Sequence, residues 1–79
     1  MRGPIYKTQL NHGTTSISGK VIHAAEQQGV MMAWYEEDGF YREYVIVATG
    51  QAPPDTAEHV CTLLSDEQTL VWHIYRVYP

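Results

Sequence analysis

Residues 30–48 read VMMAWYEEDGFYREYVIVA, and this stretch decides the fold class. It holds two runs rich in β-branched and aromatic residues, Val30–Tyr35 and Tyr41–Ala48, which favour strands. Between them stands Asp38-Gly39, a dipeptide that strongly indicates a tight hairpin turn when apolar runs flank it. The stretch therefore predicts two antiparallel strands joined at residues 38 and 39.

The sequence on both sides continues this alternation of short apolar runs and turn residues. Runs of this length with such spacing are typical of a small antiparallel β domain rather than of alternating strands and helices. The further predicted strands are Ile5–Leu10, Thr14–Ser18, Val21–Glu26, His59–Leu64 and Thr69–Tyr78. We expect residues 1–79 to form a single, mainly β domain, a small antiparallel roll or barrel of six to seven strands.

Two segments also satisfy the rules for helices. From residue 57, four apolar residues follow the i, i+3, i+4, i+7 spacing of an amphipathic helix. Asp55 and Glu58 match a capping box directly after Pro54. Local rules therefore predict one short helix near 55–64 as the alternative to a strand. Residues 20–28 also allow a helix, although Gly29 would end it after about two turns.

Three of the predicted strands, around Trp34, Val45 and Trp72, carry apolar residues on both faces. A chain of 79 residues has little material to cover two faces of a sheet. The second face has to be covered by the curled sheet itself, by a short helix or by another chain. We favour another chain and expect a homo-oligomer; the alternative is a small closed barrel with half-exposed aromatic residues outside.

The composition bounds the class of protein. With 79 residues, 44% of them hydrophobic and 18% charged, the chain is globular and holds one core. Cys61 is the only cysteine, which excludes an internal disulfide and fits a reducing compartment. No apolar run approaches the roughly 18 residues of a membrane span, and no secretory signal is visible. The net charge of −4 disfavours nucleic acid as a partner.

A possible reactive or metal-binding site involves His59 and Cys61, which stand one residue apart. In a regular strand their side chains would point the same way, and His23 or His73 could complete a metal site or supply a base. The spacing lacks the paired ligands of zinc modules, and nothing in the sequence activates the thiol. We therefore expect no metal, no cofactor and no catalytic cysteine.

Other catalytic patterns are also weak. The carboxylates of Glu36, Glu37 and Asp38 fall at a predicted turn, where water screens them. The glycines are isolated from one another, so the sequence has no phosphate-binding loop, and nucleoside triphosphate chemistry is not expected. The five basic residues are dispersed among nine acidic ones. We therefore expect binding rather than catalysis, with no enzymatic activity.

Candidate binding residues are the polar and aromatic residues of the strands. A histidine in an apolar strand needs a hydrogen-bond partner or a pocket, which makes the strand histidines the first candidates. The full set is His23, His59, His73, Arg42, Arg76, Trp34, Tyr44, Trp72 and Tyr75.

Seven short pieces cover most of the chain in order: Ile5-Tyr6-Lys7, Gly19-Lys20-Val21-Ile22-His23, Gln27-Gln28-Gly29, Ala33-Trp34, Thr49-Gly50 followed by Pro53 or Pro54, His59-Val60-Cys61-Thr62, and Val71-Trp72-His73-Ile74-Tyr75. In this order they resemble a family of short proteins of unknown function encoded by bacteriophages and prophages. That family begins with an Ile-Tyr-Lys strand and ends with a Val-Trp-His strand. Two residues depart from it, since glycine is expected at Cys61 and histidine at Gln51.

The resemblance bears on both fold and function. A position that takes glycine implies a strand or bulge, so the resemblance favours His59–Leu64 as a strand paired with Thr69–Tyr78. It implies a phage accessory protein in the host cytoplasm. From the net charge and the lack of a long apolar run we expect neither nucleic-acid nor membrane partners. We expect it to inhibit a host protein, a defence protein among the candidates. The alternatives are an oligomeric sponge for a small-molecule or nucleotide signal and a structural or assembly component of the virion.

Overall fold

The computed structural model describes residues 3–65 and 70–78, which form one antiparallel sheet. Its strands are β1 (Ile5–Gln9), β2 (Thr14–Gln27), β3 (Val30–Ala48), β4 (Ala57–Leu64) and β5 (Val71–Val77). The expected mainly β domain is confirmed, but these residues form five strands rather than six or seven. Nowhere in the described ranges is there a helix long and apolar enough to span a membrane.

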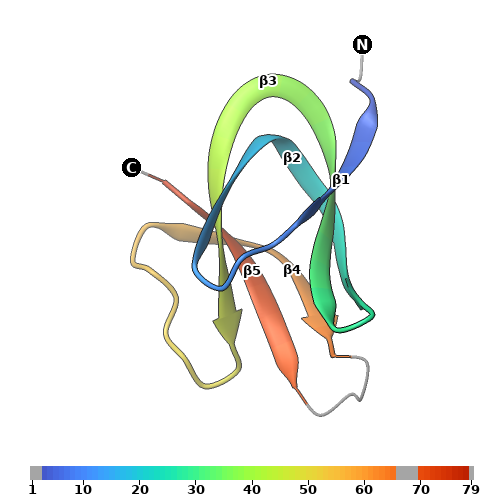
Figure 1. The fold of residues 1–79 in the computed structure, drawn as a ribbon. Coiled ribbons are helices and arrows are strands. Elements are labelled where there is room, and N and C mark those ends of the chain that lie inside the picture. Colours follow the sequence, from blue (N-terminus) through green and yellow to red (C-terminus); the bar gives the residue numbers. More distant parts are fainter. Residues whose placement is uncertain (1–2, 66–69, 79) are drawn as a thin grey trace.

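One continuous strand, β3, arches over the molecule for 19 residues with β2 nested beneath it (Figure 1). The hairpin predicted at Asp38-Gly39 is therefore wrong. At this bend Gly39 has a φ of 81°, and its N–H donates to the Glu37 carboxylate (2.8 Å). The Phe40 N–H donates to the Asp38 carboxylate (3.0 Å). These local bonds occupy backbone donors of the bend, and the two halves of β3 pair with other strands instead of with each other.

A hairpin does form earlier in the chain, at Gln28-Gly29. Both residues have positive φ, 52° and 81°, as a two-residue type I′ turn requires. The turn joins β2 to β3. β2 is one continuous strand that includes both segments predicted as separate strands, Thr14–Ser18 and Val21–Glu26. The helix alternative for residues 20–28 is wrong, because pairing with β3 keeps this segment extended.

Regular pairing between β2 and β3 is interrupted twice, between Ile17 and Gly19 and between Val21 and His23. Bulges of this kind bend a strand and increase its twist. The buried Tyr44 hydroxyl is inserted there: it accepts a hydrogen bond from the Val21 N–H (3.2 Å) and donates one to the Gly19 carbonyl (3.1 Å). The bent ribbon consequently curls around the core.

The other strands complete this curl. Since β2 occupies one edge of β3, the opposite edge is shared by β1 near its start and β5 near its end. β4 pairs with β5 and contacts β2, but the described residues show no β2–β4 pairing. The sheet is therefore an open roll, and the prediction of a closed barrel is wrong. The core residues are Leu10, Ile17, Val21, Ala24, Met31, Ala33, Tyr44, Leu63 and Ile74.

As the resemblance implied, β4 is a strand and pairs with β5. The predicted partner strand began at Thr69, which lies outside the described residues. The prediction of a short helix near 55–64 is wrong, because Ala57–Leu64 is a strand. A bulge between His59 and Cys61 explains the misleading pattern. It lets the adjacent residues Val60 and Cys61 both pack against the core, which mimics the i+3, i+4 spacing of a helix.

The curl covers the inner faces of the sheet, whereas its outer faces still carry apolar side chains. On β5, Ile74 is fully buried on the inner face. Val71, Tyr75 and Val77 are half-buried on the outer face, together with His73. Both faces of β5 are thus apolar, as expected, and the protein's own sheet covers one of them. The second copy expected to cover the outer face stays a prediction.

Candidate ligand-binding site

Three of the chain's five lysine and arginine residues meet in one cavity of about 450 Å³. Lys20 comes from β2, Arg42 from β3 and Arg76 from β5, and the lining also includes Glu58 of β4 and the buried Tyr44. These cations are dispersed in the sequence. Arg76 comes close to Arg42 because it stands opposite Tyr44 in the register of β3 and β5. Lys20 pairs with Glu36 on the first half of β3, and the Tyr44 hydroxyl, bonded to Gly19 and Val21 on either side of it, brings this part of β2 to the cavity. The cavity has an excess of positive charge in a protein of net charge −4.

Asp38 orients Arg42. The Arg42 Nη2 lies 2.9 Å from Asp38 Oδ2, and Nη1 donates to Asp38 Oδ1 (2.9 Å) and to the Phe40 carbonyl (3.1 Å). The Arg42 hydrogen bond, and to a smaller extent the Phe40 N–H, hold the pKa of Asp38 below its usual range, and the same pair raises the pKa of Arg42. These contacts use three of the five guanidinium donors. Two donors remain without a partner in the described chain and can bind a ligand.

Arg76 and Lys20 are less engaged. The Arg76 guanidinium lies 4.4 Å from the centre of the Tyr78 ring, a cation–π contact that fixes its plane without using its N–H donors. Within residues 3–65 and 70–78, no carboxylate forms an ion pair with Arg76 or Lys20. Most hydrogen-bond donors of the cavity are therefore available to an anion.

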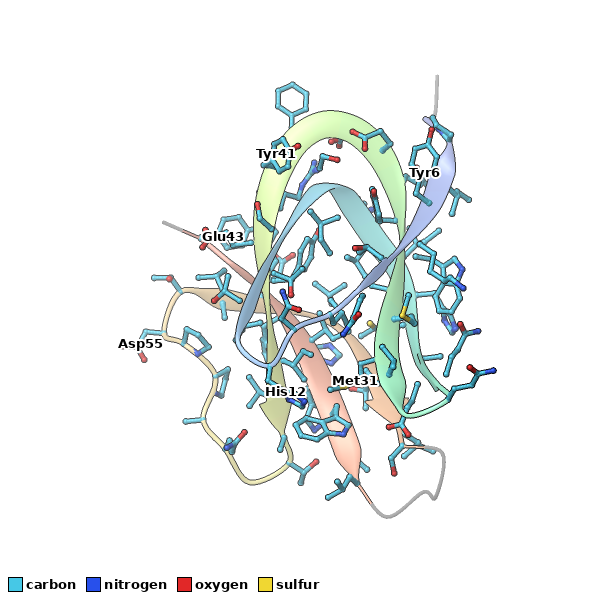
Figure 2. The ribbon with its side chains drawn as sticks, in the orientation of Figure 1. Tyr6, His12, Met31, Tyr41, Glu43 and Asp55 are labelled. Carbon is cyan, nitrogen blue, oxygen red and sulfur yellow. The ribbon has the colours of Figure 1, made fainter. Side chains whose placement is uncertain are left out.

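A second hollow of about 330 Å³ shares Arg42 and Arg76 with this cavity. Its lining adds Tyr41, Glu43 and Tyr78. Tyr41 and Glu43 lie on the half of β3 that follows the bend (Figure 2). The two arginines therefore line both hollows.

His59 lies at the cavity and begins a chain of hydrogen bonds across the outer face of β4 and β5. Its Nε2 lies 2.9 Å from Thr62 Oγ1, which lies 3.0 Å from His73 Nδ1. The His73 Nε2 lies 2.9 Å from Thr49 Oγ1, whose hydrogen is donated to the Val71 carbonyl (3.2 Å). The hydroxyl groups of Thr62 and Thr49 thus link His59 and His73 to each other and to the backbone of β5.

The structure brings several predicted binding residues together. Tyr75 lies beside His59, with ring centres 5.5 Å apart, and His73 is joined to His59 through Thr62. Four of the predicted residues line the cavity itself: Arg42, Tyr44, His59 and Arg76.

The other predicted residues lie elsewhere. His23 is exposed, and its ring centre lies 5.3 Å from that of Trp34 on β3. Trp72 packs against the core, with its ring 6.1 Å from that of His12. The three strand histidines therefore do not share one pocket, because β2 and β4 hold them on different parts of the roll.

Sequence reasoning missed Lys20 and Glu58. Both are exposed charged residues, and no local pattern marks either of them. Glu58 stands opposite Arg76 in the register of β4 and β5, and Arg76 stands opposite Tyr44. Only a correct alignment of these strands could have placed Glu58 at the cavity, and Lys20 requires the non-paired contact between β2 and β4 as well.

Cys61 does not lie beside His59. The bulge turns Cys61 towards the core, where burial raises the pKa of its thiol, while His59 stays exposed. The prediction that their side chains point the same way is wrong. Across the described residues, no group of three or more histidine, cysteine, aspartate or glutamate side chains is arranged to hold a metal ion.

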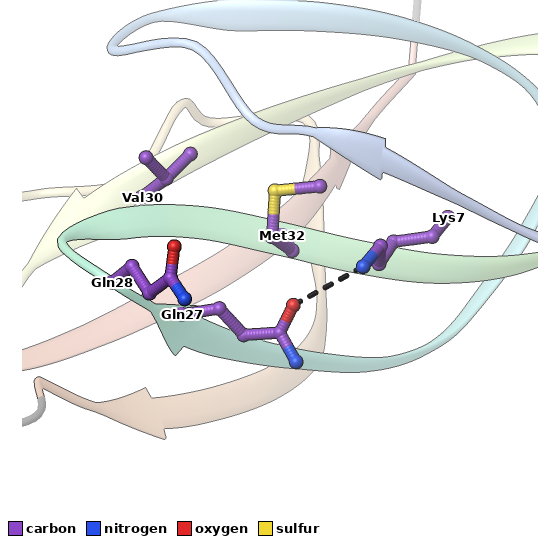
Figure 3. Close-up of a pocket in the computed structure, with 5 residues that line it drawn as sticks. All are labelled: Lys7, Gln27, Gln28, Val30 and Met32. Atoms are coloured by element: carbon purple, nitrogen blue, oxygen red, sulfur yellow. Dashed lines mark hydrogen bonds between the residues drawn. The ribbon is translucent and has the colours of Figure 1, made fainter.

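Another hollow, of about 590 Å³, lies at the β2–β3 turn (Figure 3). Of its lining residues, Lys7 is the charged one. Its Nζ donates to Gln27 Oε1 (3.3 Å) and lies 5.8 Å from the centre of the Trp34 ring. This cation is already engaged, and no second charge of the lining converges with it, so the cavity around Lys20, Arg42 and Arg76 is the better candidate site.

The fold and the cavity define a class: a small antiparallel β roll with a cation-lined cavity. The chain belongs to the family of the domain of unknown function DUF7352, whose profile matches residues 1–79. No curated protein and no solved structure matches it.

Proposed function

We propose that the protein is a non-enzymatic binding protein that takes a small anionic ligand in the cavity of Lys20, Arg42 and Arg76. The observation that carries the proposal is the convergence of three of five cations, most of whose donors have no protein partner in the described chain. Charge-assisted hydrogen bonds from such donors to phosphate or carboxylate oxygens are strong. The buried Tyr44 and Val21 give the cavity a fixed wall.

This cavity favours one of the roles expected from the sequence. A protein that sequesters a small anion inside a bacterial host would act as a sponge for a signal, in keeping with the resemblance to phage accessory proteins. Such a role needs a concave site with a few convergent polar groups, which the cavity supplies. Virion assembly finds no comparable support in the geometry, and mass analysis of purified virions tests it directly.

Inhibition of a host protein is the second candidate. Phe40 and Tyr41 are exposed by 72% and 76% at the bend of β3, and adjacent exposed aromatic residues are typical of binding hot spots. Replacing both by serine should abolish co-purification of a specific host protein, whereas replacing the exposed Tyr6 on β1 should not. Equal recovery with all variants would exclude this surface as the docking site.

Titration calorimetry with inorganic pyrophosphate tests the anion site. We expect the wild type to bind, and Lys20→Met and Arg76→Met each to weaken binding about tenfold, or ~1.4 kcal/mol. Lys7→Met removes the same charge from the hollow at the β2–β3 turn and is the matched control, with little effect expected because salt screens distant charges. Circular dichroism would verify folding of each variant. Equal losses for Lys7→Met and Arg76→Met would contradict the proposed site.

A further inference from the structure

We propose that the anion is a nucleotide, with its phosphate in the cavity of Lys20, Arg42 and Arg76 and its base between Tyr41 and Tyr78 in the adjoining hollow. This inference rests on the proposed function and names the ligand class of the same site. Its basis is that the two hollows share two lining residues, Arg42 and Arg76. A ligand that fills both needs an anionic end and a flat aromatic end.

The charges of the two hollows differ and set the direction of the ligand. The cavity combines three cations with one carboxylate, Glu58, whereas the adjoining hollow has the two shared arginines and one carboxylate, Glu43. The adjoining hollow contains Glu43, whose carboxylate would repel a second phosphate but can accept hydrogen bonds from the N–H groups of a base. The phosphate is therefore expected at the cations and the base beside Glu43.

The aromatic groups of the adjoining hollow are suited to stacking. Tyr41 is 76% exposed and Tyr78 is 37% exposed, so solvent reaches both side chains. The Arg76 guanidinium already lies against the Tyr78 ring and joins the aromatic surface to the cationic one. Stacking of bases on such rings is tolerant of base identity, and each stacked base contributes substantially to affinity.

The two hollows together have the size that a mononucleotide needs. Their volumes, about 450 and 330 Å³, fall within the usual range for small-molecule sites. The sequence has no glycine-rich phosphate loop, so the phosphate would be held by side chains from three strands. That arrangement suits binding without hydrolysis.

Equilibrium binding of GMP, ribose 5-phosphate and inorganic pyrophosphate to the full chain tests the inference. We expect GMP to bind at least about tenfold more tightly than ribose 5-phosphate, since only GMP can stack. Tyr41→Leu should remove most of this difference while leaving pyrophosphate affinity unchanged within about twofold, because the phosphate site does not include Tyr41. Tyr6→Leu, which truncates an exposed tyrosine on β1, is the matched control and should retain the preference for GMP.

The outcomes separate this inference from the proposed function. Equal affinities for GMP and ribose 5-phosphate, with pyrophosphate still bound, would overturn the nucleotide assignment and leave the anion site intact. A preference for GMP that survives in both Tyr41→Leu and Tyr78→Leu would place the base elsewhere and also overturn it. If none of the three compounds bound, both proposals would fail.

Discussion

Tyr44 shows how one side chain can shape this fold. It was a candidate binding residue in the sequence, and it does line the cavity, but its hydroxyl is also bonded to backbone groups on both sides of residue 20. The ring is only 2% exposed and contributes to the core. The residue thus connects the interruptions in β2 to the second half of β3, and the position of Lys20 at the cavity depends on it.

Removing only this hydroxyl should destabilise the protein. Tyr44→Phe keeps the ring but deprives the Val21 N–H and the Gly19 carbonyl of a buried partner, so we expect a loss of about 1–3 kcal/mol in the free energy of unfolding. Urea denaturation measures it. Tyr41→Phe, at an exposed position, should change stability little. Equal effects of the two substitutions would show that the Tyr44 hydrogen bonds contribute nothing measurable.

The Asp38–Arg42 pair should make stability depend on pH. The pKa of Asp38 is lowered in the folded protein, chiefly by its hydrogen bond to Arg42, so the ionised carboxylate stabilises the fold. This contribution is present above the pKa of the unfolded chain, about 4, and is lost as the pH falls through the lower folded value. The stability difference between wild type and Asp38→Asn should accordingly shrink from pH 6 towards pH 2.

The control for this pH series is Asp55→Asn, which removes the same charge from the exposed segment between β3 and β4. Thermal unfolding at each pH provides the measurement. A difference between wild type and Asp38→Asn that stayed constant over the whole series would mean that the pair does not stabilise the folded state.

At the level of the elements, the sequence predicted the existence of strands better than their ends. At the Gln28-Gly29 turn only the glycine is a local signal, because Gly29 adopts positive φ without steric cost, whereas Gln28 takes a φ of 52° that L-residues rarely adopt. The bend at Asp38-Gly39 has equally good local turn chemistry, yet it joins no hairpin, since β2 is long enough to pair with both halves of β3. Which of two good turns closes a hairpin depended on a partner distant in sequence.

The candidate site was predictable to the same limited extent. The residue types were informative, because Arg42, Tyr44, His59 and Arg76 do converge. Their grouping was not, since it needs the register of three strands and a contact between β2 and β4 that involves no pairing. A bulge then separated His59 from Cys61, which strict alternation along a strand had placed together.

The bulged segment of β2 is the element most sensitive to added volume. A Cβ at Gly19 would collide with the Glu36 carbonyl and the Tyr35 ring. Because the carbonyl belongs to the paired strand and cannot swing away, we expect Gly19→Ala to destabilise the protein by roughly 2–4 kcal/mol. Ser16→Ala, on the exposed face of β2, should be close to neutral. A stable Gly19→Ala variant would show that β2 and β3 can separate here at little cost.

On the scale of the whole molecule, the sign of the charge differs between the surface and the cavity. The chain carries nine acidic and five basic residues, yet three of the basic ones line one cavity with a single carboxylate. Net negative charge opposes the approach of an extended polyanion such as nucleic acid, whereas a local positive cavity attracts a small anion. The charge distribution therefore selects for ligand size as well as sign.

The outer face of β4 and β5 carries apolar side chains that bear on how whole molecules associate. Val71, Tyr75 and Val77 are half-buried there, and Leu64 of β4, opposite Val71, is 53% exposed. None of the described residues forms a further layer over this face, where apolar residues flank the hydrogen-bonded His59, Thr62 and His73. Exposed apolar patches rimmed by polar residues are typical of subunit contacts. We expect a second copy of the chain to cover it.

Light scattering across a concentration series tests this expectation. At micromolar concentration the mass should be at least about 18 kDa, twice the 9.0 kDa of one chain. Leu64→Lys places a charge on the proposed contact and should shift the protein towards the monomer, because burying an unpaired ammonium is costly. Phe40→Lys adds the same charge at the exposed bend of β3 and should leave the mass unchanged. A wild-type mass of 9.0 kDa at every concentration would mean that the outer face of β4 and β5 stays in water.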